Sequence, residues 1–181
     1  MAEIFHVAGR SHPNQPSHSP GTVLSCEPPQ SSSDPGVLGA VELRFPAGVS
    51  KHGTRYMTTL PEDASSSYAV EAIFEAVRLA EYPDKHSRMC SWFATETVED
   101  ARAFIADYRA DRSVDIWRAK GEVVHRANMA LLQALHLPVV ATLERASAYW
   151  RGDQGDASEA WEVLVKPGME LLEIVETTGP V

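Results

Sequence analysis

The last part of the chain constrains the fold most, because two short apolar runs flank a turn there. The sequence WEVLVKPGMELLEIV predicts strands over Glu162–Val165 and Met169–Val175, separated by Lys166-Pro167-Gly168. Residues 114–126, VDIWRAKGEVVHR, show the same pattern around Lys120-Gly121. We therefore expect hairpins, and with them antiparallel pairing, in the second half of the chain.

Helical patterns precede and interrupt these strands. Apolar residues recur at helical spacing within residues 68–82, and Pro83 ends that run. Thr97 and Asp100 form a variant of the capping box, which predicts the start of a second helix. Two shorter helices are expected over residues 127–135 and 139–150. Because helices and strands do not alternate regularly, the order favours the α+β class over a doubly wound sheet.

The N-terminal part contains little regular structure. Residues 3–7, EIFHV, and residues 21–24 are expected to form short strands. Residues 10–36 otherwise form long loops, because they are rich in proline and serine. A buried strand is expected at residues 90–94, CSWFA. No internal repeat is visible, and the length of 181 residues predicts a single domain spanning residues 1–181.

Composition argues against several classes of protein. Cys26 and Cys90 lie far apart in the sequence and form no C-x-x-C pair. Their spacing argues against a disulfide framework or a structural zinc site and favours a reducing compartment. The formal charge of −9 argues against nonspecific binding to nucleic acid. Since the sequence shows neither a membrane-spanning apolar run nor a secretion signal, we expect a cytoplasmic protein that binds no membrane.

Common catalytic and cofactor motifs are absent from the sequence. His6, His12 and His18 lie in or beside a proline-rich loop, without an H-E-x-x-H motif or a Cys/His cluster, so no metal is expected. The sequence contains no G-x-S-x-G elbow, Walker loop or G-x-G-x-x-G motif. If the protein binds NAD, it therefore does so outside a Rossmann site.

Two acids bracket Trp161 where the first of the two C-terminal strands begins. Glu159, two further residues, Glu162, an aliphatic strand and then Pro-Gly form a pattern that resembles the catalytic segment of the ADP-ribosyltransferase superfamily. The resemblance implies that Glu162 opens the strand and faces the NAD cleft, and that Glu159 is the preceding loop acid. It also implies the fold, a split β-sandwich of two small, mainly antiparallel sheets with flanking helices.

The rest of the chain resembles a largely uncharacterised bacterial family that is itself ADP-ribosyltransferase-like. This similarity covers nearly the whole chain, from the first strand to the last. The segments that carry it are FPAGVSKHG, YPDKHSRMCSWFATETVEDARAF, RANMALL, and YWRG followed by WEVLV.

One branch of the superfamily has a histidine in the first strand, an aromatic residue in a YFA-like motif and a late glutamate. His6 resembles the first of these, and Trp92 and Phe93 fall on the YFA-like motif, with tryptophan in place of tyrosine. No Gly-Thr follows His6. The Ser-Thr-Ser strand of another branch is missing, although Ser91 and Thr95 flank the aromatic pair. The resemblance implies that His6, Ser91 and the aromatic pair bind NAD.

The chemistry of NAD cleavage gives these residues roles. Breaking the bond between nicotinamide and ribose builds positive charge on the sugar, which a carboxylate at Glu162 stabilises. An aromatic ring stacks on the nicotinamide. Alternation along the strand places Trp92 and Phe93 on opposite faces, so only one of them can line the cleft, and we favour Trp92. Arg88 or Arg10 is expected to hold the pyrophosphate.

Each of these residues also has a structural interpretation. Glu162 alone is typical of a solvated residue at a strand edge. Trp92 and Phe93 are typical of core residues. Arg88 is suited to anchoring its loop through a salt bridge, and His6 to being an ordinary half-buried histidine.

Together these inferences predict an NAD-dependent mono-ADP-ribosyltransferase that releases nicotinamide. The acceptor is a protein, a nucleic acid or a small molecule, and Glu159 is expected to help select a guanidinium acceptor. If the acceptor is water, the enzyme is an NAD glycohydrolase of the same fold. If turnover has been lost, the chain is a non-catalytic module that binds NAD or a protein partner.

Overall fold

The computed structural model describes residues 1–12, 15–30, 32, 35–59, 67–154 and 160–179. Its strands are β1 (Ala2–Gly9), β2 (Val23–Leu24), β3 (Trp92–Ala94), β4 (Val114–Gly121), β5 (Val123–Asn128), β6 (Trp161–Val165) and β7 (Met169–Thr178). Its helices are α1 (Pro35–Arg44), α2 (Lys51–Thr58), α3 (Tyr68–Glu81), α4 (Val98–Tyr108) and α5 (Val139–Arg151), with 3₁₀ turns η1 (Arg88–Cys90) and η2 (Met129–Leu132). In this described part, no helix is both long and apolar enough to cross a membrane.

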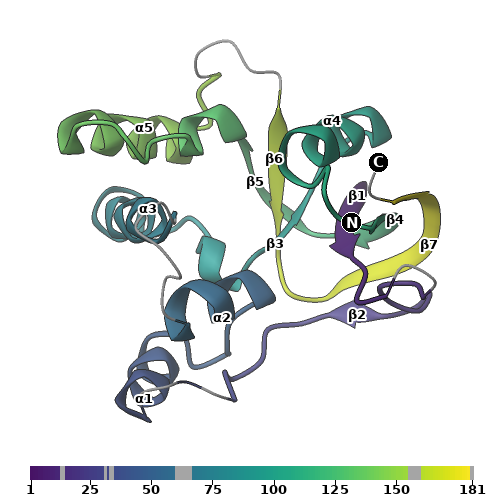
Figure 1. Cartoon of the computed structure of the whole chain (residues 1–181). Coiled ribbons are helices and arrows are strands. Elements are labelled where there is room, and N and C mark those ends of the chain that lie inside the picture. Colours follow the sequence, from purple (N-terminus) through teal and green to yellow (C-terminus); the bar gives the residue numbers. More distant parts are fainter. Residues whose placement is uncertain (13–14, 31, 33–34, 60–66, 155–159, 180–181) are drawn as a thin grey trace.

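The strands form two antiparallel sheets, which confirms the α+β class (Figure 1). One sheet has the strand order β1-β4-β7-β2, and the other has the order β3-β6-β5. A bridge between Phe5 and Thr95 links the edge strands β1 and β3, with backbone hydrogen bonds of 2.9 and 2.8 Å. The two sheets therefore meet along this edge.

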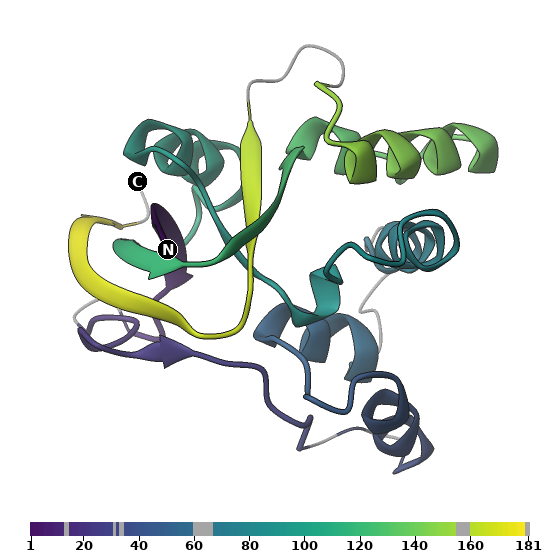
Figure 2. The ribbon, with the colours of Figure 1, turned by 180° about the vertical axis from the view of Figure 1, so that it is seen from behind.

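Helices cover the outer faces of the sheets. Helix α4 packs beside β1 on the four-stranded sheet, while α3 and α5 pack against each other beyond the three-stranded sheet (Figures 1 and 2). Along β6, Val163 and Val165 join an apolar cluster shared with the four-stranded sheet, whereas Leu164 joins a cluster with α3 and α5. The three-stranded sheet is thus covered by the other sheet on one face and by helices on the other.

The two expected hairpins are wrong, although the strands that compose them are present. β4 and β5 follow each other around Lys120-Gly121 but belong to different sheets, and so do β6 and β7. Each expected hairpin instead pairs with the other: β4 lies beside β7 in one sheet, and β5 lies beside β6 in the other. At each of the two turns, around Gly121 and around Gly168, the chain passes from one sheet into the other.

Glycine at this bend has a physical cause. A Cβ atom added at Gly121 would lie 2.3 Å from Cγ1 of Val165, so a larger residue there would clash with the paired strand. Gly168 has a φ of +101°, which L side chains rarely adopt. The sequence signals for a break in each strand were therefore correct, but they do not reveal which strand becomes the neighbour.

The helices expected over 68–82 and 139–150 are confirmed as α3 and α5. Helix α4 begins as expected after Thr97, whose hydroxyl accepts from Asp100 N at 3.0 Å. The helix expected over 127–135 is wrong. β5 runs through Asn128, whose side-chain oxygen accepts from Ala130 N at 2.8 Å and starts only the short turn η2. The sequence patterns predicted neither α1 nor α2.

Candidate functional site

A buried arginine joins two carboxylates at the start of β6. Arg88 in η1 donates from Nε and Nη2 to the two carboxylate oxygens of Glu71, at 3.0 Å each, and from Nη1 to Oε1 of Glu162. Glu71 lies on α3 and Glu162 is the second residue of β6. The exposed fractions are 6% for Glu71, 3% for Arg88 and 5% for Glu162, so bulk water screens these charges little.

Tyr149 on α5 completes this cluster. Its hydroxyl donates to Oε1 of Glu162 at 2.6 Å and accepts from Nη1 of Arg88. The Tyr149 ring is fully buried. We call Glu71, Arg88, Tyr149 and Glu162 the Arg88 network. In this network the carboxyl groups of Glu71 and Glu162 share the single guanidinium of Arg88.

The charges within the Arg88 network shift the pKa values of its members. Burial raises the pKa of Glu71, but the charge of Arg88 and the contact with His52 outweigh burial and place that pKa well below its usual range. Burial lowers the pKa of Arg88, but the charges of Glu162 and Glu71 outweigh it and raise that pKa. Burial, together with Glu162, raises the pKa of Tyr149, which therefore keeps its proton.

Aromatic rings line one side of the Arg88 network. Cζ of Arg88 lies 4.8 Å from the ring centroid of Phe93 and 5.1 Å from that of Tyr149. The His52 ring lies 4.7 Å from the Phe93 ring and 4.6 Å from the Tyr56 ring. Nε2 of His52 also lies 3.4 Å from Oε1 of Glu71. Since His52, Tyr56 and Phe93 are only partly buried, this side of the network lies nearest to solvent.

The strand pairing decides which aromatic residue shares a face with Glu162. β3 pairs with β6 so that Phe93 lies opposite Leu164, which is two residues from Glu162 and on the same face. Trp92 lies opposite Val165 and packs into the cluster between the sheets. Phe93, rather than the favoured Trp92, therefore shares the face of Glu162. Alternation placed the two rings on opposite faces correctly but did not assign the faces.

His6 lies with Trp92, on the other side of β3 from Glu162. Its Nδ1 donates to the carbonyl oxygen of Phe93 at 2.7 Å, and its ring meets Trp92 edge-on at a centroid distance of 6.0 Å. Burial, together with the charges of His18 and Lys51, lowers the pKa of His6 to about 4, although the hydrogen bond to Phe93 opposes this shift. His6 is therefore a neutral histidine at neutral pH, and only the backbone of Phe93 connects it to the Arg88 network.

The structure separates Arg10 from the Arg88 network. Arg10 follows β1 and donates from Nε to Oδ1 of Asp115 at 2.7 Å and from Nη2 to the Thr177 hydroxyl at 2.9 Å. Asp115 is fully buried and also accepts from the backbone and hydroxyl of Ser17. Arg10 thus holds the N-terminal loop against the four-stranded sheet.

The remaining predicted site residues have simpler positions. Ser91 is buried, and its hydroxyl donates to the carbonyl oxygen of Ser87 at 2.7 Å within the η1 turn. It therefore serves the local backbone. Glu159 lies outside the residues that the structure describes.

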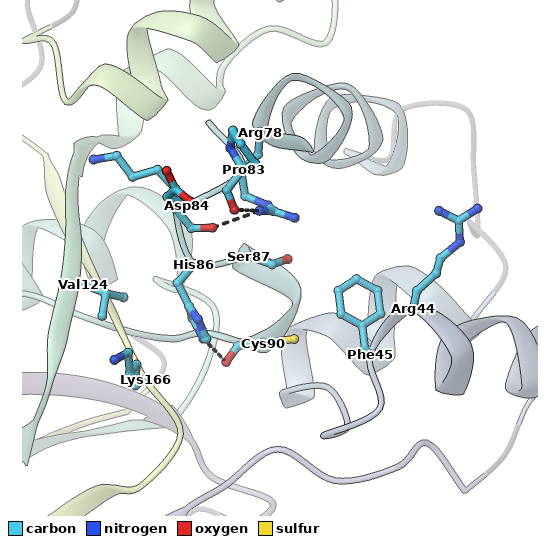
Figure 3. A pocket seen from close by; sticks show the side chains of 11 residues that line it. Arg44, Phe45, Arg78, Pro83, Asp84, His86, Ser87, Cys90, Val124 and Lys166 are labelled. Carbon is cyan, nitrogen blue, oxygen red and sulfur yellow. Dashed lines mark hydrogen bonds between the residues drawn. The ribbon is translucent and has the colours of Figure 1, made fainter. Parts of the chain in front are cut away.

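A pocket of about 540 Å³ lies beside η1, between the end of α1, the loop after α3 and the strands β5 and β6 (Figure 3). The charged residues of its lining are mainly basic, with Arg44, Arg78, Lys85 and Lys166 against the one acid Asp84. None of the predicted site residues that the structure describes lines this pocket. Ser87 and Cys90, which do line it, flank Arg88 in the sequence, so the pocket and the Arg88 network lie close together but are distinct.

Sequence reasoning missed Glu71, His52 and the role of Tyr149. A signal for Glu71 was available, because it lies three residues before Phe74 and hence on the apolar side of α3. A carboxylate on a buried helix face needs a cation, and Arg88 supplies it. His52 belongs to α2, a helix that the sequence analysis did not predict.

Two comparisons with known proteins bear on the chain. A family model described as "Protein of unknown function (DUF2441)" matches residues 48–177, a range that contains the whole Arg88 network but neither His6 nor Arg10. A search of the curated proteins found no match. Among the described residues, no group of three or more His, Cys, Asp or Glu side chains is arranged to hold a metal ion.

Proposed function

The chain belongs to the DUF2441 family, a family of unknown function, and we propose from its own residues that it is an NAD-dependent mono-ADP-ribosyltransferase. In this proposal the two sheets and their helices form an ADP-ribosyltransferase-like split β-sandwich. NAD is the co-substrate, nicotinamide is released, and ADP-ribose passes to an acceptor. The observation that carries the proposal is the buried carboxyl group of Glu162, whose carboxylate charge shares the single guanidinium of Arg88 with Glu71.

This charge suits a reaction that builds a cation. As the bond between nicotinamide and ribose breaks, positive charge develops on the anomeric carbon of the sugar. A fixed negative charge in a site with little water stabilises that charge more strongly than water does, because the protein need not reorganise. Arg88 and Tyr149 both donate to Oε1 of Glu162, so they hold this carboxylate in one orientation.

The surrounding side chains suggest how NAD would bind. Phe93, as the aromatic residue on the face of Glu162, takes the stacking role that the resemblance assigned to Trp92. Arg10 and Arg88 are both engaged by carboxylates, so the pyrophosphate needs another cation. Lys51 is exposed, and its charge acts on both His6 and His18. In this proposal Lys51 faces the phosphates.

One observation favours a second candidate, a non-catalytic module that binds NAD or a protein partner. Glu162 is an acceptor for Arg88 and for Tyr149, and such contacts are also typical of a purely structural buried ion pair. In a module of this kind, the Arg88 network would hold β6, α3 and α5 together and perform no chemistry.

Release of nicotinamide from NAD distinguishes the two candidates. The wild-type chain, Glu162→Gln and Glu75→Gln are incubated with NAD, and free nicotinamide is measured by chromatography. Glu75 is a matched control, because it too is a buried glutamate that accepts from an arginine. It lies on α3 and pairs with Arg78 and Ser87, outside the Arg88 network. We expect Glu162→Gln to lower release by about 100-fold or more, and Glu75→Gln to retain it.

The same assay identifies the class of acceptor. With NAD labelled in its adenosine half, label on a macromolecule indicates transfer, while free ADP-ribose indicates an NAD glycohydrolase. A rise in melting temperature with NAD, without release by any variant, would favour the non-catalytic module. The absence of both release and binding would exclude every NAD-dependent function.

A further inference from the structure

Two cysteines that lie far apart in the sequence meet in the fold. Sγ of Cys26 donates to the carbonyl oxygen of Cys90 at 3.3 Å, and Sγ of Cys90 donates to the carbonyl oxygen of Gly48 at 3.5 Å. Both cysteines are free thiols and are partly exposed. The thiol groups are therefore neighbours that solvent molecules can reach.

Backbone hydrogen bonds hold the segments that carry these thiols. Glu27, next to Cys26, pairs with Val49 through hydrogen bonds of 3.0 and 2.9 Å. Ser50 N donates to the carbonyl oxygen of Met89, next to Cys90, at 2.9 Å. The neighbours of both cysteines are therefore hydrogen-bonded to the same short segment, Val49-Ser50. The two cysteines thus stay close without any rearrangement of the chain.

The environment gives the two thiols different reactivity. A hydrogen bond with the Cys90 side chain lowers the pKa of Cys26, although burial opposes this effect. The same hydrogen bond, with burial, raises the pKa of Cys90. Since the thiolate is the nucleophile, Cys26 is the thiol that attacks first. Cys90 lines the basic pocket beside η1, which opens one side of the pair to small molecules (Figure 3).

We propose that Cys26 and Cys90 form a reversible intramolecular disulfide by exchange with a low-molecular-weight disulfide. The Cys26 thiolate attacks one sulfur of the small disulfide and displaces its first half as a thiol. Cys90 then loses its proton, attacks the sulfur of Cys26 and displaces the second half. One small disulfide is reduced to two thiols, and two protein thiols are oxidised to one disulfide.

This bond would fasten the N-terminal segment to the part of the fold that carries the Arg88 network. Cys26 lies between β2 and α1, while Cys90 is the last residue of η1, two residues after Arg88. A disulfide between residues far apart in the sequence restricts the unfolded chain, so the oxidised protein should melt at a higher temperature. The proposal does not depend on the function proposed above.

Equilibration in glutathione buffers tests the disulfide. The wild-type chain, Cys26→Ser and Cys90→Ser are incubated at graded ratios of oxidised to reduced glutathione, free thiols are alkylated, and intact masses are measured. We expect the wild type to lose both alkylation sites together, with the mass of a monomer lacking two hydrogens. Each serine variant should keep its remaining thiol or carry one glutathione.

Folding provides the decisive control. If the fold brings the thiols together, the same chain unfolded in urea should need a buffer at least about tenfold more oxidising to form the bond. Equal behaviour of folded and unfolded chains would overturn the proposal. So would a folded wild type that ends as a mixed disulfide with glutathione or as a linked dimer.

Discussion

Two buried arginine–carboxylate clusters in this protein differ in their balance of charge. Around Asp115, one carboxylate meets one guanidinium, that of Arg10, and the remaining donors are neutral groups of Ser17 and Thr177. In the Arg88 network, a single guanidinium serves the carboxylates of Glu71 and Glu162. Asp115 thus has a guanidinium to itself, while Glu71 and Glu162 share one.

The pKa values show what each arrangement does to its carboxylate. Burial raises the pKa of Asp115, but hydrogen bonds from Arg10, Ser17 and Thr177 outweigh burial and lower it. The guanidinium of Arg10 and the neutral donors of Ser17 and Thr177 therefore act together to keep Asp115 charged. Glu71 instead depends on the full charge of Arg88. The two clusters therefore differ in kind: in one, a single carboxylate with its own guanidinium and neutral donors fastens a loop, and in the other, two carboxyl groups share one guanidinium.

Removal of each arginine tests this difference and should have the largest effect. Arg88→Gln leaves two carboxylates buried without a cation, and we expect a loss of about 3–5 kcal/mol in the free energy of unfolding. Arg10→Gln leaves Asp115 with its neutral donors, and we expect a loss of about 1–3 kcal/mol. Urea denaturation monitored by tryptophan fluorescence measures both. Equal losses would show that charge balance does not distinguish the two clusters.

Acid should weaken the fold through His6 while Glu71 and Asp115 keep their charges. The pKa of His6 is about 4 in the folded chain and 6.5 as its ordinary value, so between these pH values the unfolded chain binds a proton that the folded chain does not. Stability is therefore lost as the pH falls from 6.5 to 4, by up to about 3 kcal/mol. Glu71 and Asp115 stay ionised over this range, because their pKa values are lowered.

The variant His6→Asn isolates this contribution. Stability measured by urea denaturation at a series of pH values should fall less steeply in His6→Asn than in the wild type. His125, which is buried and also has a lowered pKa, acts in the same direction in both proteins and cancels in the comparison. Parallel curves for the two proteins would mean that acid acts on the carboxylate clusters instead.

Removal of one hydroxyl from each cluster should have the smallest effect. Tyr149→Phe removes one of the two hydrogen bonds described at Glu162, and we expect a loss of about 1–2 kcal/mol. Thr177→Val leaves Asp115 with Arg10 and Ser17, and we expect a loss of about 0.5–1 kcal/mol. Thermal unfolding measures both. A larger loss for Thr177→Val would reverse the ranking of the two clusters.

Particular residues show how far sequence reasoning reached. Glu162 was singled out from its place before a strand, and the structure buries it where β6 begins. Arg88 was expected to hold phosphate or to anchor its loop, and its ion pairs agree with the anchoring role. Trp92 and Phe93 were correctly placed on opposite faces, but the sequence did not show that Phe93 is the one on the face of Glu162. Nothing in the local pattern states which face of a strand meets helices and which meets another sheet.

By itself, the sequence determined the local features of this protein. These features are the periodicity of α3, the cap at Thr97 and the breaks at Gly121 and Gly168. Each depends on residues only a few positions apart, so the sequence alone is enough to predict it. Only the tertiary structure decided that β4 and β5 enter different sheets and that one guanidinium is shared by Glu71 and Glu162. These outcomes depend on contacts between segments that are far apart in the chain. Several strands could pair with the same neighbour, and only the packing of the whole core selects one pairing.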